Sequence, residues 1–426
     1  MKKNSFIKGA ALLIIGGFIT KALGLFIRII LTRKIGTEGI GIYMMIMPTY
    51  TLLVSLATLG FPTAISKLVA EDKYNNKKLV LGIIPISLLI NFFLILFMFI
   101  SSGFISNNLL HEERTYLGLI SIGFVLPFIS LSSILRGYFF GKQRILPHVI
   151  SNILEDVIRL VMIILIVPLI LPFGIEYTVS FVILISIFSE LSSIIIFISC
   201  LPKKVQLKEF KPVKKNVNNI LSISLPTTGS RIIGSIGYFL EPIIFNFILL
   251  RIGFNNEIIV KEYGIINGYV MPLLLLPSFF TTAISQILIP IISKSYSNKN
   301  YNYTKKKIKQ ALILSLIVGI PATLIFIIYP NILLKLIYKT DLGVSYVRFL
   351  APICLLYYIE TPLVSSLQAM GKASLAMKGT LYGMIIRIIT LIIGTYFFNI
   401  WGLILAISAN IIFVSLYQLK QVKKLL

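Results

Sequence analysis

The chain has 426 residues, of which 57% are hydrophobic and only 13% are charged, and its mean hydropathy is +0.94. Since no core of this size can hide that much apolar surface from water, the composition excludes a soluble protein. The net charge of +25 would suggest a nucleic-acid partner for a soluble chain, but the scarcity of charged residues argues against nucleic acid here. The sequence predicts an all-α polytopic membrane protein.

Apolar runs long enough for a helix to cross a bilayer recur along the whole chain, and each crossing needs roughly 20 apolar residues. The first run follows a basic N-terminus and resembles a signal peptide, but it continues without a small-residue cleavage site, so we expect a retained span. The predicted spans, in chain order, are 6–31, 40–68, 79–102, 116–140, 149–171, 176–200, 219–250, 263–292, 310–337, 347–370, 375–398 and 401–419.

The basic residues test this count of twelve. With the N-terminus inside, 27 of the 40 Lys and Arg residues fall in internal segments, eight fall in external segments and five lie within spans. Such an excess on one side is typical of cytoplasmic loops. We therefore predict a multi-pass protein of a bacterial plasma membrane with both termini in the cytoplasm.

The most basic break falls near the middle of the chain, with six predicted spans on each side. Both halves then enter the membrane in the same sense, so repeats would be parallel and related by an axis along the membrane normal. The predicted organisation is an N-terminal six-helix lobe (1–202), a basic cytoplasmic linker (203–218) and a C-terminal six-helix lobe (219–426), arranged around a central cavity.

Short matches between the halves indicate an internal duplication. They recur in the same order at offsets of 210 to 230 residues. The pairs are Lys21-Ala-Leu-Gly24 with Arg231-Ile-Ile-Gly234, Met47-Pro48 with Met271-Pro272, Gly141-Lys142 with Gly371-Lys372, and Ile158-Arg159 with Ile386-Arg387.

One segment carries a resemblance to a known family. The run Arg136-Gly-Tyr-Phe-Phe-Gly141, followed by Pro147, Ser151, Glu155 and Arg159, resembles the R-G-Y-F-x-G segment of stage V sporulation protein B-like flippases. These belong to the multidrug/oligosaccharidyl-lipid/polysaccharide exporter superfamily, and further stretches of both halves look similar. The resemblance implies a flippase that moves undecaprenyl-linked saccharides outward across the plasma membrane. Many members have fourteen spans, whereas this chain ends after twelve.

Charged residues at membrane depth are costly and usually face a cavity or a partner. Lys21 and Arg28 lie two helical turns apart and share a face of the first span, and Arg231 takes the place of Lys21 in the second half. Because Arg and Lys form charge-assisted hydrogen bonds with phosphate oxygens, we predict that a head-group pyrophosphate binds these cations, with Arg387 as a further candidate. Pairing between helices and snorkelling to lipid head groups are the alternative interpretations.

The remaining charges are predicted to be structural or gating groups: Arg136, Glu155, Arg159, Glu241 and Glu360. Glu155 and Arg159 have the favourable i,i+4 order of an intrahelical pair. For Arg387 the sequence leaves two interpretations open, a cavity charge or a partner of Glu360. Glu241 precedes a proline and could cap freed backbone donors or pair with Arg231, although ten residues of helix separate the two.

Prolines remove backbone hydrogen bonds and allow spans to bend. Broken helices at matching places in two halves indicate a transport site, although proline is common in membrane helices. The predicted hinges or helix breaks are Pro48, Pro62, Pro226, Pro272, Pro277 and Pro290.

The sequence shows no nucleotide-binding loop, metal-ligand cluster or nucleophile–base motif, and its two cysteines lie in or at the end of apolar runs. We therefore predict no cofactor, no metal and no enzymatic activity. The predicted partners are a lipid-linked oligosaccharide, membrane lipids and a coupling ion, for a chain that acts as a monomer. A cation antiporter of the multidrug-and-toxin-extrusion type and a polytopic glycosyl ligase are the alternatives.

Overall fold

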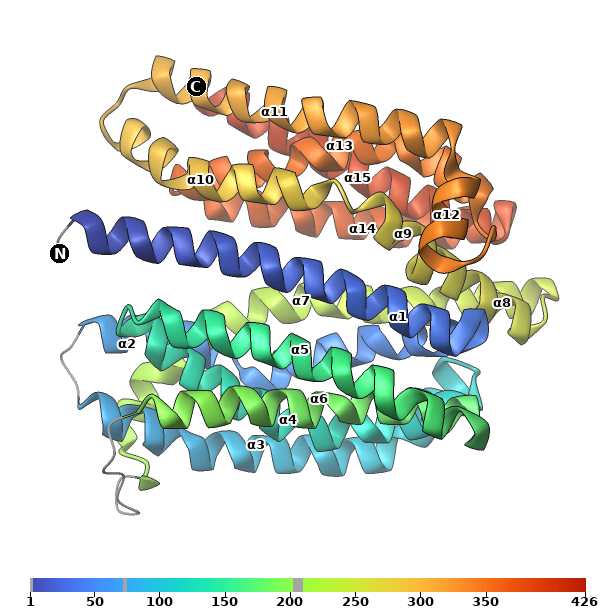
Figure 1. The fold of residues 1–426 in the computed structure, drawn as a ribbon, viewed down its shortest axis with the longest axis horizontal. Coiled ribbons are helices and arrows are strands. Elements are labelled where there is room, and N and C mark those ends of the chain that lie inside the picture. The colour runs from blue at the N-terminus through green and yellow to red at the C-terminus, as the bar shows by residue number, and fades with distance from the viewer. Residues whose placement is uncertain (1–2, 72–74, 202–209) are drawn as a thin grey trace. The chain divides into compact units, whose positions relative to one another are not determined.

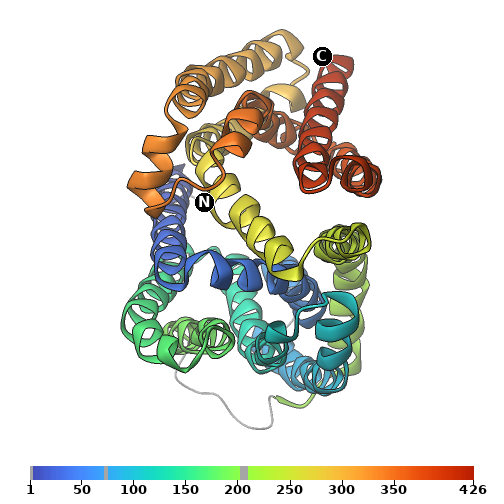
Figure 2. The same ribbon diagram turned by 90° about the vertical axis from the view of Figure 1, so that its right-hand side faces the viewer.

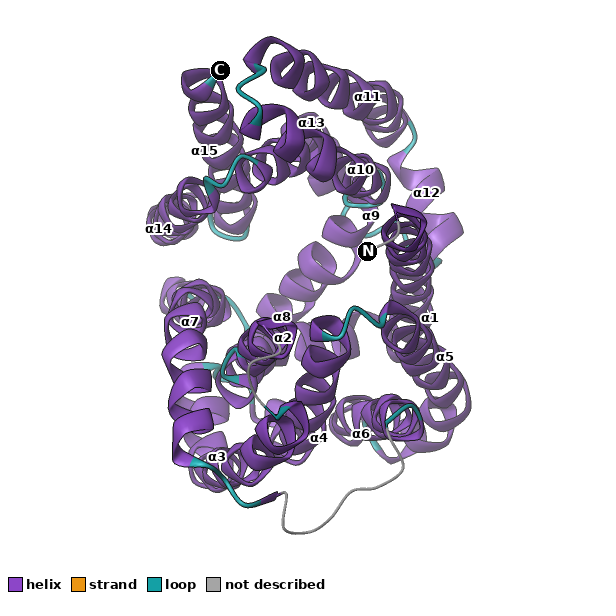
Figure 3. Ribbon diagram, turned by 90° about the vertical axis from the view of Figure 1, so that its left-hand side faces the viewer, coloured by secondary structure: helices purple, strands orange, loops and turns teal. Residues whose placement is uncertain are grey.

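The computed structural model describes residues 3–71, 75–201 and 210–426, and Figure 1 shows that these form helices joined by short connections. Within these ranges there is no β-strand, as the colouring of Figure 3 makes plain. The described chain divides into two compact units, Met1–Leu240 and Glu241–Leu426.

Unit 1 contains the helices of the first half. They are α1 (Lys3–Thr58), α2 (Phe61–Glu71), α3 (Asn76–Phe104), the π-helix Ile105–Leu109, the 3-10 turn Glu113–Thr115, α4 (Tyr116–Gly141), α5 (Ile145–Ile170), the 3-10 turn Leu171–Phe173, α6 (Ile175–Ser199) and the first part of α7 (Lys214–Ile252).

Unit 2 contains the rest of α7 and the helices of the second half. They are α8 (Asn256–Gly264), the π-helix Ile265–Val270, α9 (Met271–Leu274), α10 (Ser278–Ser297), α11 (Tyr301–Ile328), α12 (Pro330–Tyr338), α13 (Val344–Ala369), α14 (Ala373–Phe398) and α15 (Trp401–Leu425).

Two predicted spans lie within α1, which folds back on itself at Gly36. Gly36 has φ 69° and ψ −171°, backbone angles that only glycine adopts readily. Arg28 Nη2 lies 3.3 Å from Met44 Sδ, whereas sixteen residues of straight helix would separate them by about 24 Å. The arms before and after Gly36 therefore pack against each other, and Figure 2 shows the blue ribbon of α1 changing direction.

The number of membrane crossings follows from this fold-back. Ten helices of the described chain are long and apolar enough to cross a membrane, or eleven when the bent pair Asn256–Leu274 and Ser278–Ser297 counts as one span. The stretch Ile15–Glu71 counts once among these although it has 57 residues, about three times what a 30 Å bilayer core needs. With its two arms taken as two crossings, the described residues account for the twelve predicted spans.

The two units repeat the same helix lengths, which supports the predicted duplication. The helices of the fourth predicted span of each half, α4 and α13, have 26 residues each. The fifth pair, α5 and α14, also has 26 residues each, and the sixth pair, α6 and α15, has 25 each. The fold is therefore an all-helical duplication with six predicted spans in each half.

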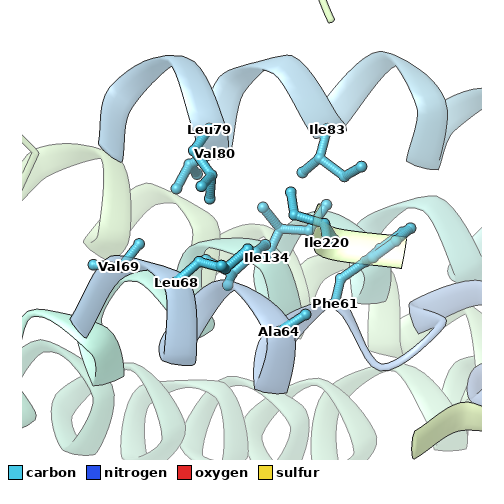
Figure 4. Close-up of a cluster of buried hydrophobic side chains, with 10 residues drawn as sticks. Phe61, Ala64, Leu68, Val69, Leu79, Val80, Ile83, Ile134 and Ile220 are labelled. Atoms are coloured by element: carbon cyan, nitrogen blue, oxygen red, sulfur yellow. The ribbon is translucent and has the colours of Figure 1, made fainter. Parts of the chain in front are cut away.

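The first part of α7 packs with unit 1. Ile220 is fully buried in a cluster with side chains of α2, α3 and α4 (Figure 4), namely Phe61, Ala64, Ile65, Leu68, Val69, Leu79, Val80, Ile83 and Ile134. The hydroxyls of Ser55 and Ser235 lie 3.2 Å apart and join α1 to α7. This packing explains why the compact units divide at Leu240, inside α7, whereas the predicted C-terminal lobe begins at residue 219. Residues 202–209 of the predicted linker lie outside the described ranges, so the linker stays a prediction.

The Arg-Gly-Tyr-Phe-Phe-Gly motif brings α4 into close contact with α2. A Cβ on Gly137 would lie 2.7 Å from the carbonyl oxygen of Pro62, and one on Gly141 would lie 2.7 Å from that of Ser66. Both pairs are spaced by four residues, so the two glycines form one small-residue face at the helix contact. Phe139, between them in the motif, is fully buried and stacks on Phe197 of α6 at 5.3 Å.

Candidate functional site

The first arm of α1 presents the predicted head-group cations. Lys21 and Arg28 are both partly buried on this arm, and the Arg28 guanidinium donates to Met44 Sδ across the fold-back. The chain has no Asp or Glu before Glu38, so this arm carries positive charge without an acidic residue of its own. Arg231 on α7 is exposed. The binding role of the three cations stays a prediction.

A charge network joins α4 and α5 in unit 1. Arg159 Nη2 donates to Glu155 Oε1 at 3.1 Å, which confirms the predicted i,i+4 pair, and Asp156 lies 3.8 Å from the same guanidinium. Arg136 Nη2 donates to the other oxygen of Glu155 at 3.3 Å. One carboxylate therefore bridges two arginines from two helices. The Arg136–Glu155 pair joins α4 to α5 and has no helical spacing along the chain, so it could not be predicted from the sequence.

Next to this network, a cavity of about 260 Å³ opens between α1, α5 and α6. Its polar lining consists of Arg159 and the side chains of Tyr43, Tyr50 and Ser186, and apolar residues line the rest. Tyr43 and Tyr50 are seven residues apart on the second arm of α1 and so share a helix face. That spacing was visible in the sequence but was not recognised as part of a site.

In unit 2 an ion pair joins α7 to α14. Glu241 on α7 is only 2% exposed, and its Oε2 lies 2.5 Å from Arg387 Nη2 on α14. Tyr263 donates a hydrogen bond to Glu241 Oε1 at 3.3 Å. On the sequence alone, Glu360 is a candidate partner of Arg387, and Arg231 is a candidate partner of Glu241. The structure instead pairs Glu241 with Arg387.

The arginines of the two units occupy matching positions. Arg159 and Arg387 are each the fifteenth residue of their helices, α5 and α14. Each pairs with a carboxylate, but that carboxylate comes from a different helix in each unit: Glu155 of α5 in unit 1 and Glu241 of α7 in unit 2.

A Ser–Glu hydrogen bond, buried in unit 1 and partly buried in unit 2, links the helices of the fourth and sixth predicted spans of each half, with the residue types exchanged. In unit 1, Ser132 of α4 donates to Glu190 of α6. In unit 2, Ser415 of α15 donates to Glu360 of α13 at 3.4 Å. Ser132 and Glu360 are each the seventeenth residue of their helices. The duplication thus keeps the contact while moving the carboxylate from one helix to the other.

The predicted hinge prolines fall at different kinds of places. Pro48 lies inside α1, while Pro62 is the second residue of α2, just after Leu59 and Gly60 with positive φ. Pro272 is in α9, and Pro277 immediately precedes α10, in a helix pair bent by 53°. The side chains of Pro226 and Pro290 lie outside the described residues. Their roles as hinges stay predictions.

In the part of the chain that the structure describes, no group of three or more His, Cys, Asp or Glu residues is arranged to hold a metal ion. The chemistry available in these spans is therefore that of arginine, lysine, carboxylate and hydroxyl groups. These groups bind and position charged ligands by hydrogen bonds.

Comparison with known proteins places this chain in a family. Residues 6–296 match the family described as polysaccharide biosynthesis protein, and residues 232–393 match the MatE family. The chain is 35% identical to stage V sporulation protein B of Bacillus subtilis (strain 168), covering 100% of this chain and 85% of that protein. It is 24% identical to the lipid II flippase MurJ of the same organism, covering 99% and 83%.

A solved structure shares the fold. The inward-facing multidrug resistance MATE family transporter of the MOP superfamily superposes with a TM-score of 0.75 at 14% identity, with 95% of each chain covered. The family model over residues 6–296 and the full-length relative at 35% identity show that the chain belongs to the polysaccharide biosynthesis protein family, and its apolar helices make it a multi-pass membrane protein.

Proposed function

We propose that this protein moves an undecaprenyl-diphosphate-linked saccharide from the inner to the outer leaflet of a bacterial plasma membrane by alternating access. The observation that carries the proposal is the cationic first arm of α1, where Lys21 and Arg28 share one face and no acidic residue precedes Glu38. A diphosphate brings negative charge and several acceptor oxygens, which lysine and arginine match. The relative named as a lipid II flippase supports a substrate of this chemical class.

The lipid tail stays in the bilayer in this mechanism, while the head group crosses the membrane. Lys21 and Arg231 occupy equivalent places in the duplication, so both halves contribute a cation to the head group. Membrane potential, an ion gradient or consumption of the product outside provides the driving force. Both termini lie in the cytoplasm, as the distribution of basic residues indicates.

The test is flipping of a fluorescent undecaprenyl-diphosphate saccharide by the full-length protein in proteoliposomes. Lys21→Ala and Arg231→Ala each remove a cation and should abolish flipping while the protein still inserts. Lys21→Arg keeps the charge and should retain transport. Lys335→Ala is the matched control, because it also removes a cation but outside the predicted head-group site. The Lys335 side chain is 65% exposed, and its ammonium lies 3.8 Å from the equally exposed Asp341. Normal flipping by both alanine variants would refute the proposal.

A cation antiporter is the second candidate function, because the spans also contain carboxylates, which bind cations. Glu360 accepts a hydrogen bond from Ser415, and Glu190 accepts one from Ser132, so each has a hydroxyl as a direct partner. Organic-cation efflux that is lost in Glu360→Gln would favour this candidate. Formation of a glycosylated product by the purified protein would instead favour a ligase.

A further inference from the structure

A cleft of about 470 Å³ opens in unit 2 between the ends of α7 and α14. Most of its lining is apolar and much of it aromatic: Phe247, Ile248, Arg251 and Ile252 from α7, and Ile392, Ile393, Tyr396 and Phe397 from α14. The volume falls within the roughly 300–1,000 Å³ typical of ligand sites. It is separate from the unit 1 cavity at Arg159.

The ion pair described above lies just before this cleft on both helices. Glu241 precedes Phe247 by six residues, and Arg387 precedes Ile392 by five. Residue numbers rise along both helices from the ion pair to the rim, so α7 and α14 run in the same direction here. The Glu241–Arg387 pair ties the two helices together at one end, and the cleft opens toward their C-terminal ends at Ile252 and Phe398.

Arg251 is the one charged residue among those lining the cleft. It lies in the last turn of α7, and its guanidinium sits 4.3 Å from the centre of the Phe247 ring. This cation–π contact holds the charge at the cleft, where it meets the apolar walls. The loop after α7 is external in the predicted topology, so Arg251 lies at head-group level of the outer leaflet.

An apolar cleft with a cation at its outer end matches a lipid with an apolar chain and a phosphate. We propose that the cleft between α7 and α14 holds the chain of a phosphate-headed isoprenoid lipid, with Arg251 contacting the phosphate. A single cleft between two helices accommodates one chain, which suits a one-chain isoprenoid lipid better than a two-chain phospholipid. The inference rests on the proposed function and adds to it a place where the lipid is held in the outer leaflet.

The experiment measures binding of undecaprenyl phosphate to the full-length protein in detergent by native mass spectrometry, with phosphatidylglycerol as the competing lipid. Arg251→Gln removes the charge, and Ile393→Trp fills the cleft. Arg348→Gln is the matched control, since Arg348 is another exposed arginine of the predicted external segments that does not line the cleft. Each cleft variant should bind about tenfold more weakly, as expected for loss of a charge-assisted contact or of the chain site, and the control should bind as the unaltered protein does.

The outcomes separate this inference from the proposed function. Unchanged undecaprenyl phosphate binding in both folded cleft variants would overturn the cleft site while leaving flipping by the unaltered protein intact. Phosphatidylglycerol that binds as tightly and is lost equally in these variants would make the cleft a general phospholipid site and also overturn the inference. An unaltered protein that neither binds undecaprenyl phosphate nor flips its saccharide-linked form would refute the proposed function itself.

Discussion

The carboxylate of Glu241 on α7 lies 2.5 Å from the guanidinium of Arg387 on α14, and 146 residues of chain separate them. Glu241 is 2% exposed and Arg387 24% exposed. A charge buried this deeply is tolerated in a membrane span only with a partner. The pair therefore ties together two helices of unit 2 that line a cleft beyond it.

Breaking this pair on one side should destabilise the protein. Glu241→Gln or Arg387→Gln alone leaves a charge without its partner, and each should lower the free energy of unfolding by about 3 kcal/mol. The double variant Glu241→Gln/Arg387→Gln leaves no unpaired charge and should cost less than the two single changes together. Thermal unfolding of the purified protein in detergent measures all four forms. A double variant whose loss equals the sum would show that the two groups do not interact.

The network at Glu155 should depend more on the carboxylate than on either arginine. Glu155 accepts from Arg136 at 3.3 Å and from Arg159 at 3.1 Å. Glu155→Gln therefore weakens both contacts and should lower the free energy of unfolding by about 2 kcal/mol, more than Arg136→Gln does.

The matched control for this network is Asp156→Asn. Asp156 is 3.8 Å from Arg159, beyond hydrogen-bond distance, so the change should cost less than about 1 kcal/mol. Thermal unfolding in detergent again provides the measurement. An Asp156→Asn variant less stable than Glu155→Gln would contradict this prediction, because Asp156 and not Glu155 would then be the main carboxylate of the network.

The glycines of the Arg-Gly-Tyr-Phe-Phe-Gly motif should not tolerate a methyl group. A Cβ on Gly137 would lie 2.7 Å from a backbone oxygen of α2, and that backbone cannot move as a side chain can. Gly137→Ala should therefore cost about 1–3 kcal/mol of unfolding free energy, seen as a lower unfolding temperature. Gly24→Ala in α1 is the control, because its Cβ would meet no atom within 4 Å. Equal stability of the two variants would contradict close packing of α2 and α4.

What could be predicted from the sequence was what is local or follows from composition. The apolar runs predicted the spans, and the i,i+4 spacing predicted the Glu155–Arg159 pair, because both depend only on helix geometry and the bilayer. The contacts of Arg136 with Glu155 and of Glu241 with Arg387 depend on which helices pack together and how each is rotated. One sequence does not contain that information.

The sequence showed the duplication, but it did not show which residues the equivalent arginines contact. Matching short motifs predicted equivalent arginines, and Arg159 and Arg387 do occupy the same helical position. Their acidic partners come from different helices, Glu155 from α5 itself and Glu241 from α7. The break between the predicted spans 6–31 and 40–68 already required the chain to turn there, and the structure places this turn at Gly36.

The two native cysteines offer a test of the predicted topology without disturbing any charged group. Cys200 is exposed at the C-terminal end of α6, and Cys354 is fully buried in α13. In the predicted topology Cys200 lies at the cytoplasmic face. A membrane-impermeant maleimide should therefore label the protein in inverted vesicles but not in intact cells, and Cys200→Ser should abolish that label, while Cys354 reacts only after denaturation.

An external control completes the test in the same chain. Lys261 is exposed on α8, which the predicted topology places outside. Lys261→Cys in a Cys200→Ser background should label in intact cells and not in sealed inverted vesicles. The reverse pattern for both positions would place the segments carrying 27 basic residues outside and those carrying eight inside. Since that distribution opposes the usual cytoplasmic excess of Lys and Arg, such a result would invert the termini and, with them, the direction in which the proposed transport runs.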